Sequence, residues 1–289
     1  MFKIIKKITL KTFYKIYSYN SFLGRTYLIL LLFLRKQKRK IRLSKKMNES
    51  TLILKYFESI KQKGGVLFDV GASTGSFFER FLGSEKDWKI YAFDPDPDKM
   101  KQEALKYFSR KENVEFIHKA CSNKSGEKLQ FFASEVSTGI SSLHAFHSSH
   151  HKTGDVETIT LSDFILNSQI DSIDILKIDT EGHDLFVLQG FPWDALKPKV
   201  IFCEFENRKT IALGYDFQKL GDYFIEKGYH VFVSEWFPVV EYGTTHKWRE
   251  IKSYPTKLED ENAFGNFICF RDKFMDNDYL DFLFNSEID

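Results

Sequence analysis

The stretch "VLFDVGASTG" at residues 66–75 is the part of the sequence that decides the fold. Val66–Val70 is apolar except for one carboxylate, Asp69, as in a strand that is buried on both of its faces. Two glycines, Gly71 and Gly75, bracket the turn that follows. Glycine tolerates a positive φ and lets a ligand or a helix approach the backbone closely. The stretch therefore predicts a strand, a tight turn and a helix, with the turn as a candidate ligand site.

Strand-like and helix-like segments alternate through residues 49–289, which is typical of an α/β sheet. The expected strands of this sheet are 65–70, 89–94, 114–120, 173–179, 199–206, 230–236 and 264–270. The expected helices are 75–84, 96–110, 161–168, 182–190 and 216–229. Two further strands, 127–134 and 155–160, alternate like an antiparallel pair with a Ser/His-rich loop between them. Residues 237–262 look irregular, and so long a connection is more typical of a functional loop than of a structural one.

The composition is that of a globular protein, with 43% hydrophobic and 28% charged residues. The chain has three cysteines, Cys121, Cys203 and Cys269, which are far apart and include no CxxC pair. This pattern speaks against a disulfide framework or a zinc site built on cysteines. We expect buried free thiols, which are consistent with a reducing compartment.

The charges are distributed unevenly along the chain. Residues 1–48 hold 14 Lys or Arg and no Asp or Glu, whereas residues 49–289 hold 28 Lys or Arg and 40 Asp or Glu. The net charges of the two parts are therefore +14 and −12, although the whole chain carries +2. We expect residues 1–48 to be a separate basic segment, with an anionic partner, attached to an α/β domain at 49–289.

The basic segment has the pattern of a helix at a membrane surface. Lysines recur at every fourth position from 3 to 15, and apolar side chains fall mostly on the opposite side of a helix. The apolar run 26–34 is too short to cross the hydrocarbon core, which takes about 20 helical residues. We therefore expect a cytoplasmic protein that lies peripherally on the anionic inner face of the membrane. The alternatives are an arm that packs on its own domain with solvated charges and, less favoured, an arm that binds nucleic acid.

The glycine turn does not fit the common phosphate-binding motifs. Residues 71–75 read "GASTG", which is neither GxGxxG nor GxxxxGK[ST]. Asp69 would repel a pyrophosphate but suits a ligand that carries an ammonium group. Asp94 follows the second strand, 25 residues after Asp69, where a carboxylate can accept hydrogen bonds from both hydroxyls of a ribose. Together, Asp69, the glycine turn and Asp94 fit S-adenosylmethionine better than NAD. In the structural alternative, Asp69 caps its own turn and Asp94 caps the helix after Pro95.

A second group of ionisable residues follows the fourth strand, in "LKIDTEGHD" at 176–184. Charged side chains at the end of an apolar strand need partners or a ligand, because an unpaired buried charge is costly. This strand is expected beside the first one, so the group would face the glycine turn across a crevice. The candidate general bases are Asp179, Glu181, His183 and Glu204. In the structural alternative, Lys177 merely forms an ion pair with Glu204 or Glu206.

These segments resemble the FkbM-type S-adenosylmethionine-dependent methyltransferases. "VLFDVGASTGSF", "YAFDPDP", "TITLSDF" and "ILKIDTEGHDLFVLQG" stand in the order and spacing of that family over Gly64–Phe270. Asp184 stands where the family usually carries Glu, and Ser162 where an Asp is frequent. The resemblance implies a class I (Rossmann-like) methyltransferase fold, mostly parallel and seven-stranded, with an antiparallel last strand at 264–270. It also implies O-methylation of a sugar hydroxyl, in surface glycans, or of a natural product.

On this basis the candidate residues receive roles toward S-adenosylmethionine. Asp69 is assigned to the methionyl ammonium, Asp94 to the ribose, and the remaining cofactor residues to backbone approach or to the adenine: Gly71, Ala72, Gly75, Lys119 and Ala120. Asp179 or Glu181 is the preferred base for a hydroxyl acceptor. Carboxylates at 179, 181 and 204 could hold Mg²⁺ or Ca²⁺, but we predict no metal. The Ser/His-rich loop is expected to be a solvated loop over the active site that contacts substrate hydroxyls. The aromatic residues of 236–248 are expected to stack on sugar rings or to pack in the core.

Two other functions stay open from the sequence. A nucleic-acid methyltransferase would also use a basic arm, although no Pro-Pro of an Asn-Pro-Pro-Tyr box occurs. The chain could also be a methyltransferase fold that has lost its catalytic activity and serves as a binding module. The presence of acidic residues at 69, 94 and 179 argues against such a loss. The failed dinucleotide motif disfavours an NAD-dependent dehydrogenase.

Overall fold

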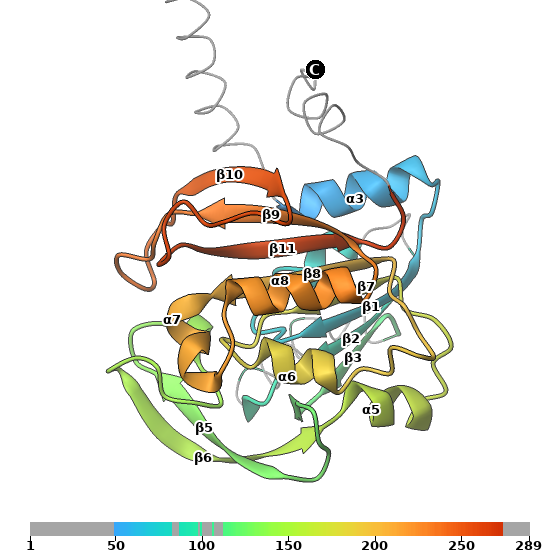
Figure 1. Ribbon diagram of the computed structural model, residues 1–289. Coiled ribbons are helices and arrows are strands. Elements are labelled where there is room, and N and C mark those ends of the chain that lie inside the picture. The colour runs from blue at the N-terminus through green and yellow to red at the C-terminus, as the bar shows by residue number, and fades with distance from the viewer. Residues whose placement is uncertain (1–48, 83–86, 98, 100–105, 107–111, 274–289) are drawn as a thin grey trace, which may run out of the picture. The chain divides into compact units, whose positions relative to one another are not determined.

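The computed structural model describes residues 49–82, 87–97, 99, 106 and 112–273. In this part of the chain, eight strands form one mixed sheet in the order β10-β9-β11-β8-β7-β1-β2-β3 (Figure 1). The strands of this sheet are β1 Gly65–Val70, β2 Trp88–Phe93, β3 Val114–Ile117, β7 Ile175–Ile178, β8 Val200–Glu206, β9 His230–Trp236, β10 Trp248–Ser253 and β11 Phe264–Phe270. The α-helices are α3 Glu49–Ser59, α5 Leu161–Asn167, α6 Asp184–Gln189, α7 Asn207–Thr210 and α8 Phe217–Glu226.

Strand β1 takes an interior position in the sheet because it is apolar on both faces. It pairs in parallel with β2 on one side and with β7 on the other. The chain order reverses between β1 and β7, since β2 and β3 extend the sheet one way and β8 extends it the other. The carboxyl ends of β1 and β7 therefore flank the crevice in which open α/β sheets bind ligands. This confirms that the strand ending at Asp179 lies next to the strand that precedes the glycine turn.

The antiparallel part of the sheet is larger than predicted. Strand β11 runs antiparallel to both of its neighbours, β8 and β9, as expected for the last strand. Strand β10, an eighth strand that we did not predict, pairs antiparallel with β9 at the edge of the sheet. It carries Arg249, Glu250 and Lys252 and is half-buried along most of its length, so it lacks the alternating apolar face by which strands are recognised. Residues 237–262, expected to be irregular, thus contain an edge strand.

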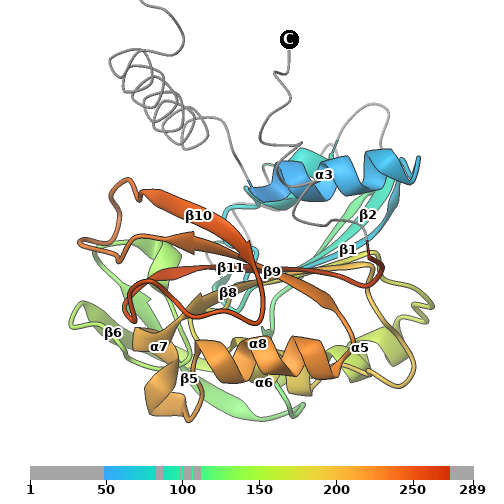
Figure 2. The same ribbon diagram turned by 45° about the horizontal axis from the view of Figure 1, so that its top comes forward.

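Helices cover both faces of the sheet. In both ribbon views α5, α6 and α8 lie on one face and α3 on the other (Figures 1 and 2). Helix α8 buries Phe217, Leu220 and Phe224, which recur at helical spacing, and the side chain of Asp216 caps it by accepting a hydrogen bond from the Lys219 backbone at 2.9 Å. The predicted helices 161–168, 182–190 and 216–229 are confirmed as α5, α6 and α8, whereas α3 was not predicted.

Two helices are shorter than predicted, and for one of them, α6, the backbone conformation gives the reason. The segment after the glycine turn forms, within the described residues, one turn of 3₁₀ helix at Phe78–Phe81. Helix α6 begins at Asp184 because Glu181 and Gly182, just before it, have φ values of 57° and 99°. Positive φ lies outside the right-handed helical region, so no α-helix can include these two residues.

A second, small sheet follows β3. It contains β4 Ala120–Cys121, β5 Lys128–Ser134 and β6 His150–Ile159 in the order β4-β6-β5. Strands β5 and β6 pair antiparallel, which confirms the predicted pair. The Ser/His-rich loop that joins them, residues 135–149, is called the histidine loop below. Its residues Ser142 and Leu143 lie at the carboxyl ends of the main sheet, in one cavity with Gly71 and Asp179.

Some predictions fall outside the described residues, namely those for residues 1–48 and for most of the helix 96–110. Among the helices that the structure does describe, none combines the length and the apolar composition that crossing a bilayer requires. The three cysteines are buried free thiols, as predicted.

Candidate active site

A cavity of about 300 Å³ lies at the carboxyl ends of β1, β2 and β7. The glycine turn lines one side of it through Gly71, Ser73 and Thr74, and Ser142 and Leu143 of the β5–β6 loop line another. Among the described residues, three carboxylates line this cavity: Asp94, Asp179 and Glu181. One lysine, Lys99, also lines it, so the carboxylates outnumber the cationic groups among the described lining residues. The cavity lies at the point where the strand order reverses.

The glycine turn is fixed to both neighbouring strands. Gly71 has a φ of +75°, and a Cβ at this position would overlap the carbonyl oxygen of Asp179 at the end of β7. The backbone N–H groups of Gly71 and Ala72 donate to the carbonyl of Phe93 at 2.9 and 3.0 Å, which ties the turn to the end of β2. Ala72 is buried, and the N–H of Gly75 closes the turn on the Ala72 carbonyl at 2.8 Å. Of the three predicted turn residues, Gly71 lines the cavity, while Ala72 and Gly75 shape the turn behind it.

The position of Asp94 is compatible with both roles that the sequence left open. Its carboxylate accepts hydrogen bonds from the backbone of Ser73 at 2.8 Å and of Asp96 at 2.9 Å. It therefore holds both the glycine turn and the segment that follows β2. It also lines the cavity, at the end of β2 where a ribose-binding carboxylate was predicted. The side chain is buried, and this burial raises the pKa of Asp94.

Asp69, in contrast, is not brought to the cavity. Its carboxylate is fully buried and forms an ion pair with the Nζ of Lys177 at 2.9 Å. The two residues are direct neighbours in the β1–β7 register, and Lys177 also donates to the carbonyl of Gly71 at 2.6 Å. The structure therefore does not support a direct contact between Asp69 and a methionyl ammonium, and Asp69 acts on the glycine turn through Lys177. The alternative pairing of Lys177 with Glu204 or Glu206 is not formed either.

A smaller cavity of about 20 Å³ adjoins the first and shares Gly71 and Leu143 with it. Lys119 and Ala120, the residues predicted to flank an adenine, both line it. The ammonium of Lys119 is held by Glu157 at 2.7 Å, so it does not place a free charge in this cavity. The predicted residues for the two ends of an adenosyl group thus lie in one continuous region.

The turn after β7 carries the candidate bases and is held in an unusual conformation. Glu181 has a φ of 57°, a left-handed conformation that is uncommon for residues other than glycine and that occurs at functional sites. Asp184 maintains this turn by accepting hydrogen bonds from the backbone of Thr180 at 2.8 Å and of Gly182 at 3.2 Å. The side chains of Asp179 and Glu181 line the cavity as a result.

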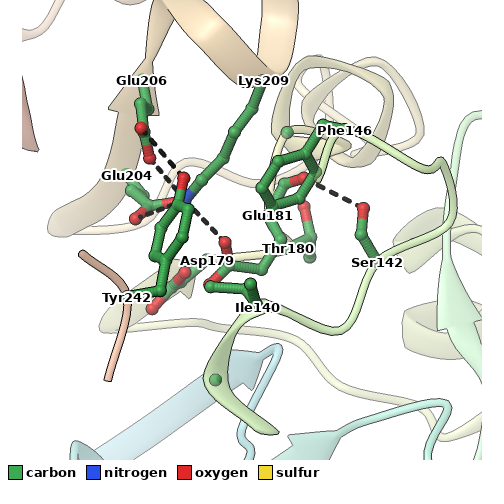
Figure 3. Close-up of polar contacts among 12 residues, drawn as sticks. Ile140, Ser142, Phe146, Asp179, Thr180, Glu181, Glu204, Glu206, Lys209 and Tyr242 are labelled. Atoms are coloured by element: carbon green, nitrogen blue, oxygen red, sulfur yellow. Dashed lines mark hydrogen bonds and ion pairs between the residues drawn. The ribbon is translucent and has the colours of Figure 1, made fainter. Parts of the chain in front are cut away.

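Glu181 is part of a buried cluster centred on Lys209, a residue that the sequence analysis did not single out. The Nζ of Lys209 lies 2.5 Å from Glu181, 2.8 Å from Glu204 and 3.0 Å from Glu206 (Figure 3). Glu206 also binds Arg208, at 2.6 Å. Glu204 does not line the cavity, although a carboxylate oxygen of it lies within 4.8 Å of oxygens of Asp179 and Glu181, which do. One signal was available: three carboxylates at the ends of neighbouring strands require a cation, and Lys209 lies three residues after Glu206.

The pKa values of this cluster are shifted from their usual range. Burial raises the pKa of Glu181 to about 7, despite the attraction of Lys209. Burial likewise raises the pKa of Glu204 well above its usual value. The two groups share one lysine, so their titration belongs to the pair rather than to either residue.

His183 lies outside the cavity. Its Nε2 is 3.0 Å from the hydroxyl of Ser122, and its ring stacks on Phe186 with 4.6 Å between ring centroids. Burial, with a smaller repulsion from His144, lowers the pKa of His183 to about 4, so the ring is neutral. The structure therefore does not bring this candidate base to the acceptor side.

The histidine loop, residues 135–149, is bonded to the same turn. The hydroxyl of Ser142 donates to the carbonyl of Glu181 at 3.0 Å, and the Nε2 of His144 lies 3.0 Å from the carbonyl of Lys209. His150 is held against the carbonyl of Ile140 at 2.9 Å. These histidines fix the loop to the protein, in place of the solvated loop that we expected.

The fold and the cavity define a class I, Rossmann-like methyltransferase. The family model described as "Methyltransferase FkbM domain" matches residues 69–231. The chain belongs to the FkbM family of S-adenosylmethionine-dependent methyltransferases, as the resemblance implied. No curated protein matches the chain.

Several solved structures are similar to this chain in fold. One is methyltransferase FkbM from Methylobacillus flagellatus KT, with 14% identity and a TM-score of 0.42 over 66% of this chain and 44% of that one. This chain thus spans less than half the length of that protein. Others are a precorrin-6y C5,15-methyltransferase from Geobacter metallireducens GS-15, with 16% identity and a TM-score of 0.39 over 73% and 82%, and an rRNA methylase from Streptococcus thermophilus, with 9% identity and a TM-score of 0.35 over 78% and 98%. At such scores these similarities carry no argument about the acceptor.

The residues of the cavity fit S-adenosylmethionine. A volume of about 300 Å³ with an adjoining smaller cavity is at the lower end of the range of small-molecule sites. The three lining carboxylates suit a ligand that carries a sulfonium and an ammonium group. Asp94 would hold the ribose, and Lys119 and Ala120 would flank the adenine.

Proposed function

We propose that this protein is an O-methyltransferase that acts on a hydroxyl group of a sugar, in a surface polysaccharide or glycolipid precursor, or of a natural product. The observation that carries the proposal is the position of Asp179 and Glu181. Both line the cavity assigned to the methyl donor, together with residues of the glycine turn. A hydroxyl that enters this cavity would meet a carboxylate base beside the donor.

The chemistry divides between the cofactor and the protein. S-adenosylmethionine supplies an activated methyl group together with its leaving group. The protein holds the acceptor oxygen in line, which can contribute several kcal/mol to lowering the barrier. A sugar hydroxyl also requires a base that takes its proton as the new bond forms.

Glu181 is the base that the geometry favours. A general base works best when its pKa lies near the operating pH, and burial raises the pKa of Glu181 to about 7. Lys209 and the hydroxyl of Ser142 hold the residue at its side chain and at its carbonyl. Asp179, which is more exposed, is placed to bind the acceptor or to share the role of base.

The charge of the cavity supports a neutral acceptor over nucleic acid. Three carboxylates, Asp94, Asp179 and Glu181, line the cavity against one lysine, Lys99, and this excess of acidic groups disfavours the phosphates that flank a nucleotide. Phe131, an aromatic residue that lines the cavity, offers a ring against which a sugar can pack. Phe146 and Tyr242, beside the carboxylates in Figure 3, pack in a small core cluster instead. We therefore propose a glycan or other polyhydroxyl acceptor, with nucleic acid disfavoured.

The cofactor assignment is tested by thermal-shift titration of the wild type and of Asp94→Ala. We expect S-adenosylmethionine and S-adenosylhomocysteine to stabilise the wild type, NAD to have no effect, and the shift to be largely lost in the variant. Transfer of a radiolabelled methyl group to pools of glycans, glycolipids and RNA then tests the acceptor. Label that enters RNA but no hydroxyl-bearing glycan or natural product would contradict the proposal.

For residues 1–48 we propose an anionic membrane surface as the partner, on the basis of the 14 basic residues and the absence of acidic ones in that sequence. This places the enzyme peripherally at the inner face of the membrane, where a lipid-linked glycan precursor would be accessible. Sedimentation with vesicles of phosphatidylglycerol is expected for the full chain and not for a chain that lacks residues 1–46. Equal sedimentation of the two chains would reject this partner.

A further inference from the structure

The ends of β7 and β8 bring four carboxylates together, of which the first two line the cavity: Asp179, Glu181, Glu204 and Glu206 (Figure 3). Oxygen atoms of the first three lie within 4.8 Å of one another. Oxygen ligands that share one Mg²⁺ or Ca²⁺ are separated by no more than about 5 Å, given metal–oxygen distances of about 2.0 to 2.6 Å. By spacing alone, this cluster resembles a site for a divalent cation.

The structure places a cation of the protein itself at this point. The Nζ of Lys209 contacts Glu181, Glu204 and Glu206 at 2.5, 2.8 and 3.0 Å. The ammonium donates hydrogen bonds to both carboxylate oxygens of Glu204, at 3.0 and 2.8 Å, and forms ion pairs with Glu181 and Glu206. Burial opposes the charge of this lysine, but the surrounding carboxylates raise its pKa well above the usual value, so it is charged.

Lys209 is also prevented from leaving the cluster. Its side chain is 2% exposed, and α7, the helix that carries it, follows β8 directly. The carbonyl of Lys209 is bonded to His144, and its Nζ lies 5.7 Å from the centre of the Phe146 ring, both in the histidine loop. Withdrawal of the ammonium would leave three carboxylates facing one another in a buried region, which is strongly unfavourable.

We propose that Lys209 is a positioning residue that takes the place of a divalent metal ion. It supplies one positive charge that the carboxylates share, and it fixes Glu181 at the edge of the cavity. The enzyme would then hold its base without a metal, whereas loss of the ammonium would turn the carboxylates into a divalent-cation site. The role of Glu181 as the base rests on the proposed function. The replacement of the Lys209 ammonium by a divalent cation does not depend on it.

The test uses Mn²⁺ as the probe and the full chain as the protein. The variants are Lys209→Met, which keeps the length of the side chain and removes its charge, and Lys152→Met, a matched control whose lysine pairs with Asp155 on the surface. Electron paramagnetic resonance measures free Mn²⁺, and thermal denaturation measures the response of the fold. These two measurements require no methyl acceptor, so they stay informative if the acceptor class is wrong.

We expect the wild type and Lys152→Met to bind no stoichiometric Mn²⁺ and to keep their melting temperatures when it is added. Lys209→Met is expected to melt lower, to bind one Mn²⁺ at least tenfold more tightly than the wild type, and to regain stability with Mn²⁺. A purely structural role of Lys209 would give the lower melting temperature without the rescue, and that result would overturn the proposal.

A wild-type measurement keeps the proposal testable if Lys209→Met does not fold. Stoichiometric binding of Mn²⁺ by the wild type that is abolished in Glu204→Gln would show that a metal and not Lys209 fills the cluster. Loss of methyl transfer after EDTA treatment, restored by Mn²⁺, would have the same meaning. Unchanged transfer in EDTA, with no Mn²⁺ bound by the wild type, is the expected outcome.

Discussion

The ion pair between Lys177 and Asp69 gives a quantitative test of how the glycine turn is held. The change is Lys177→Met, which leaves the Asp69 carboxylate fully buried without its counter-charge. Removing one partner of a buried pair lowers stability by about 3–5 kcal/mol. For a chain of this size, at about 2–4 °C per kcal/mol, the melting temperature should fall by roughly 6–20 °C.

Replacement of both partners separates this charge effect from the general effect of a core substitution. In Asp69→Leu with Lys177→Met the charges are gone, so the variant should recover most of the loss, except for about 1 kcal/mol from the hydrogen bond to the Gly71 carbonyl. Urea denaturation followed by tryptophan fluorescence gives the free energies of unfolding for this double-mutant cycle. A double variant that is as unstable as the single one would refute the ion pair as the cause.

The pH dependence of the single variant provides a second check. Without Lys177, the buried Asp69 is protonated in the folded state and ionised in the unfolded state near neutral pH. The folded state then binds one more proton than the unfolded state, so stability relative to the wild type should fall by about 1.4 kcal/mol for each unit of rising pH. This fall begins above the ordinary pKa of an aspartate, about 3.9, and ends where the folded protein releases the proton. A stability difference that does not change between pH 5 and pH 8 would contradict this account.

Two further predictions concern the site itself. Because burial raises the pKa of Glu181 to about 7 and a base must be ionised, kcat/KM should rise about tenfold per pH unit below pH 7 and level off above it. Glu181→Gln should lose both this titration and most of the activity. A titration that persists in the variant would assign it to another group. Gly71→Ala should destabilise the fold by about 2 kcal/mol or more and weaken binding of S-adenosylmethionine, because its φ is +75° and a Cβ would overlap the Asp179 carbonyl. The control is Gly126→Ala, where φ is +77° but nothing lies within 4 Å of the added carbon, so only the conformational loss of about 1 kcal/mol is expected and cofactor binding should not change.

The parallel part of the sheet could be predicted because its strands are short, apolar and separated by helical patterns. The run at 66–70 is buried on both faces, and this is visible in the sequence as a nearly continuous apolar stretch. Strand β10 could not be recognised in this way, because an edge strand has few neighbours and tolerates charges along its length. Residues 248–253 accordingly show neither an apolar run nor a clean alternation.

The candidate site was predictable in its location and only partly in its contacts. The ends of parallel strands meet at one edge of a sheet, so residues 94, 179 and 181 could be placed at one cavity from their positions in the chain. The partners of a charged side chain depend on the register between strands, which the sequence does not reveal. Asp69 was therefore assigned to a ligand although it faces Lys177, and Lys209 was overlooked because it lies in a four-residue helix without a strong pattern.

The bonds from Ser142 and His144 to the turn after β7 and to α7 bear on how acceptor preference can change in this fold. The loop that lines the cavity also fixes the carbonyl of Glu181 and the residue that holds its side chain. A graft of the loop from a relative would thus alter reactivity together with selectivity, unless the serine and the histidine were transplanted with it. New acceptors are more readily obtained by substitutions elsewhere in the loop, with these two anchors left in place.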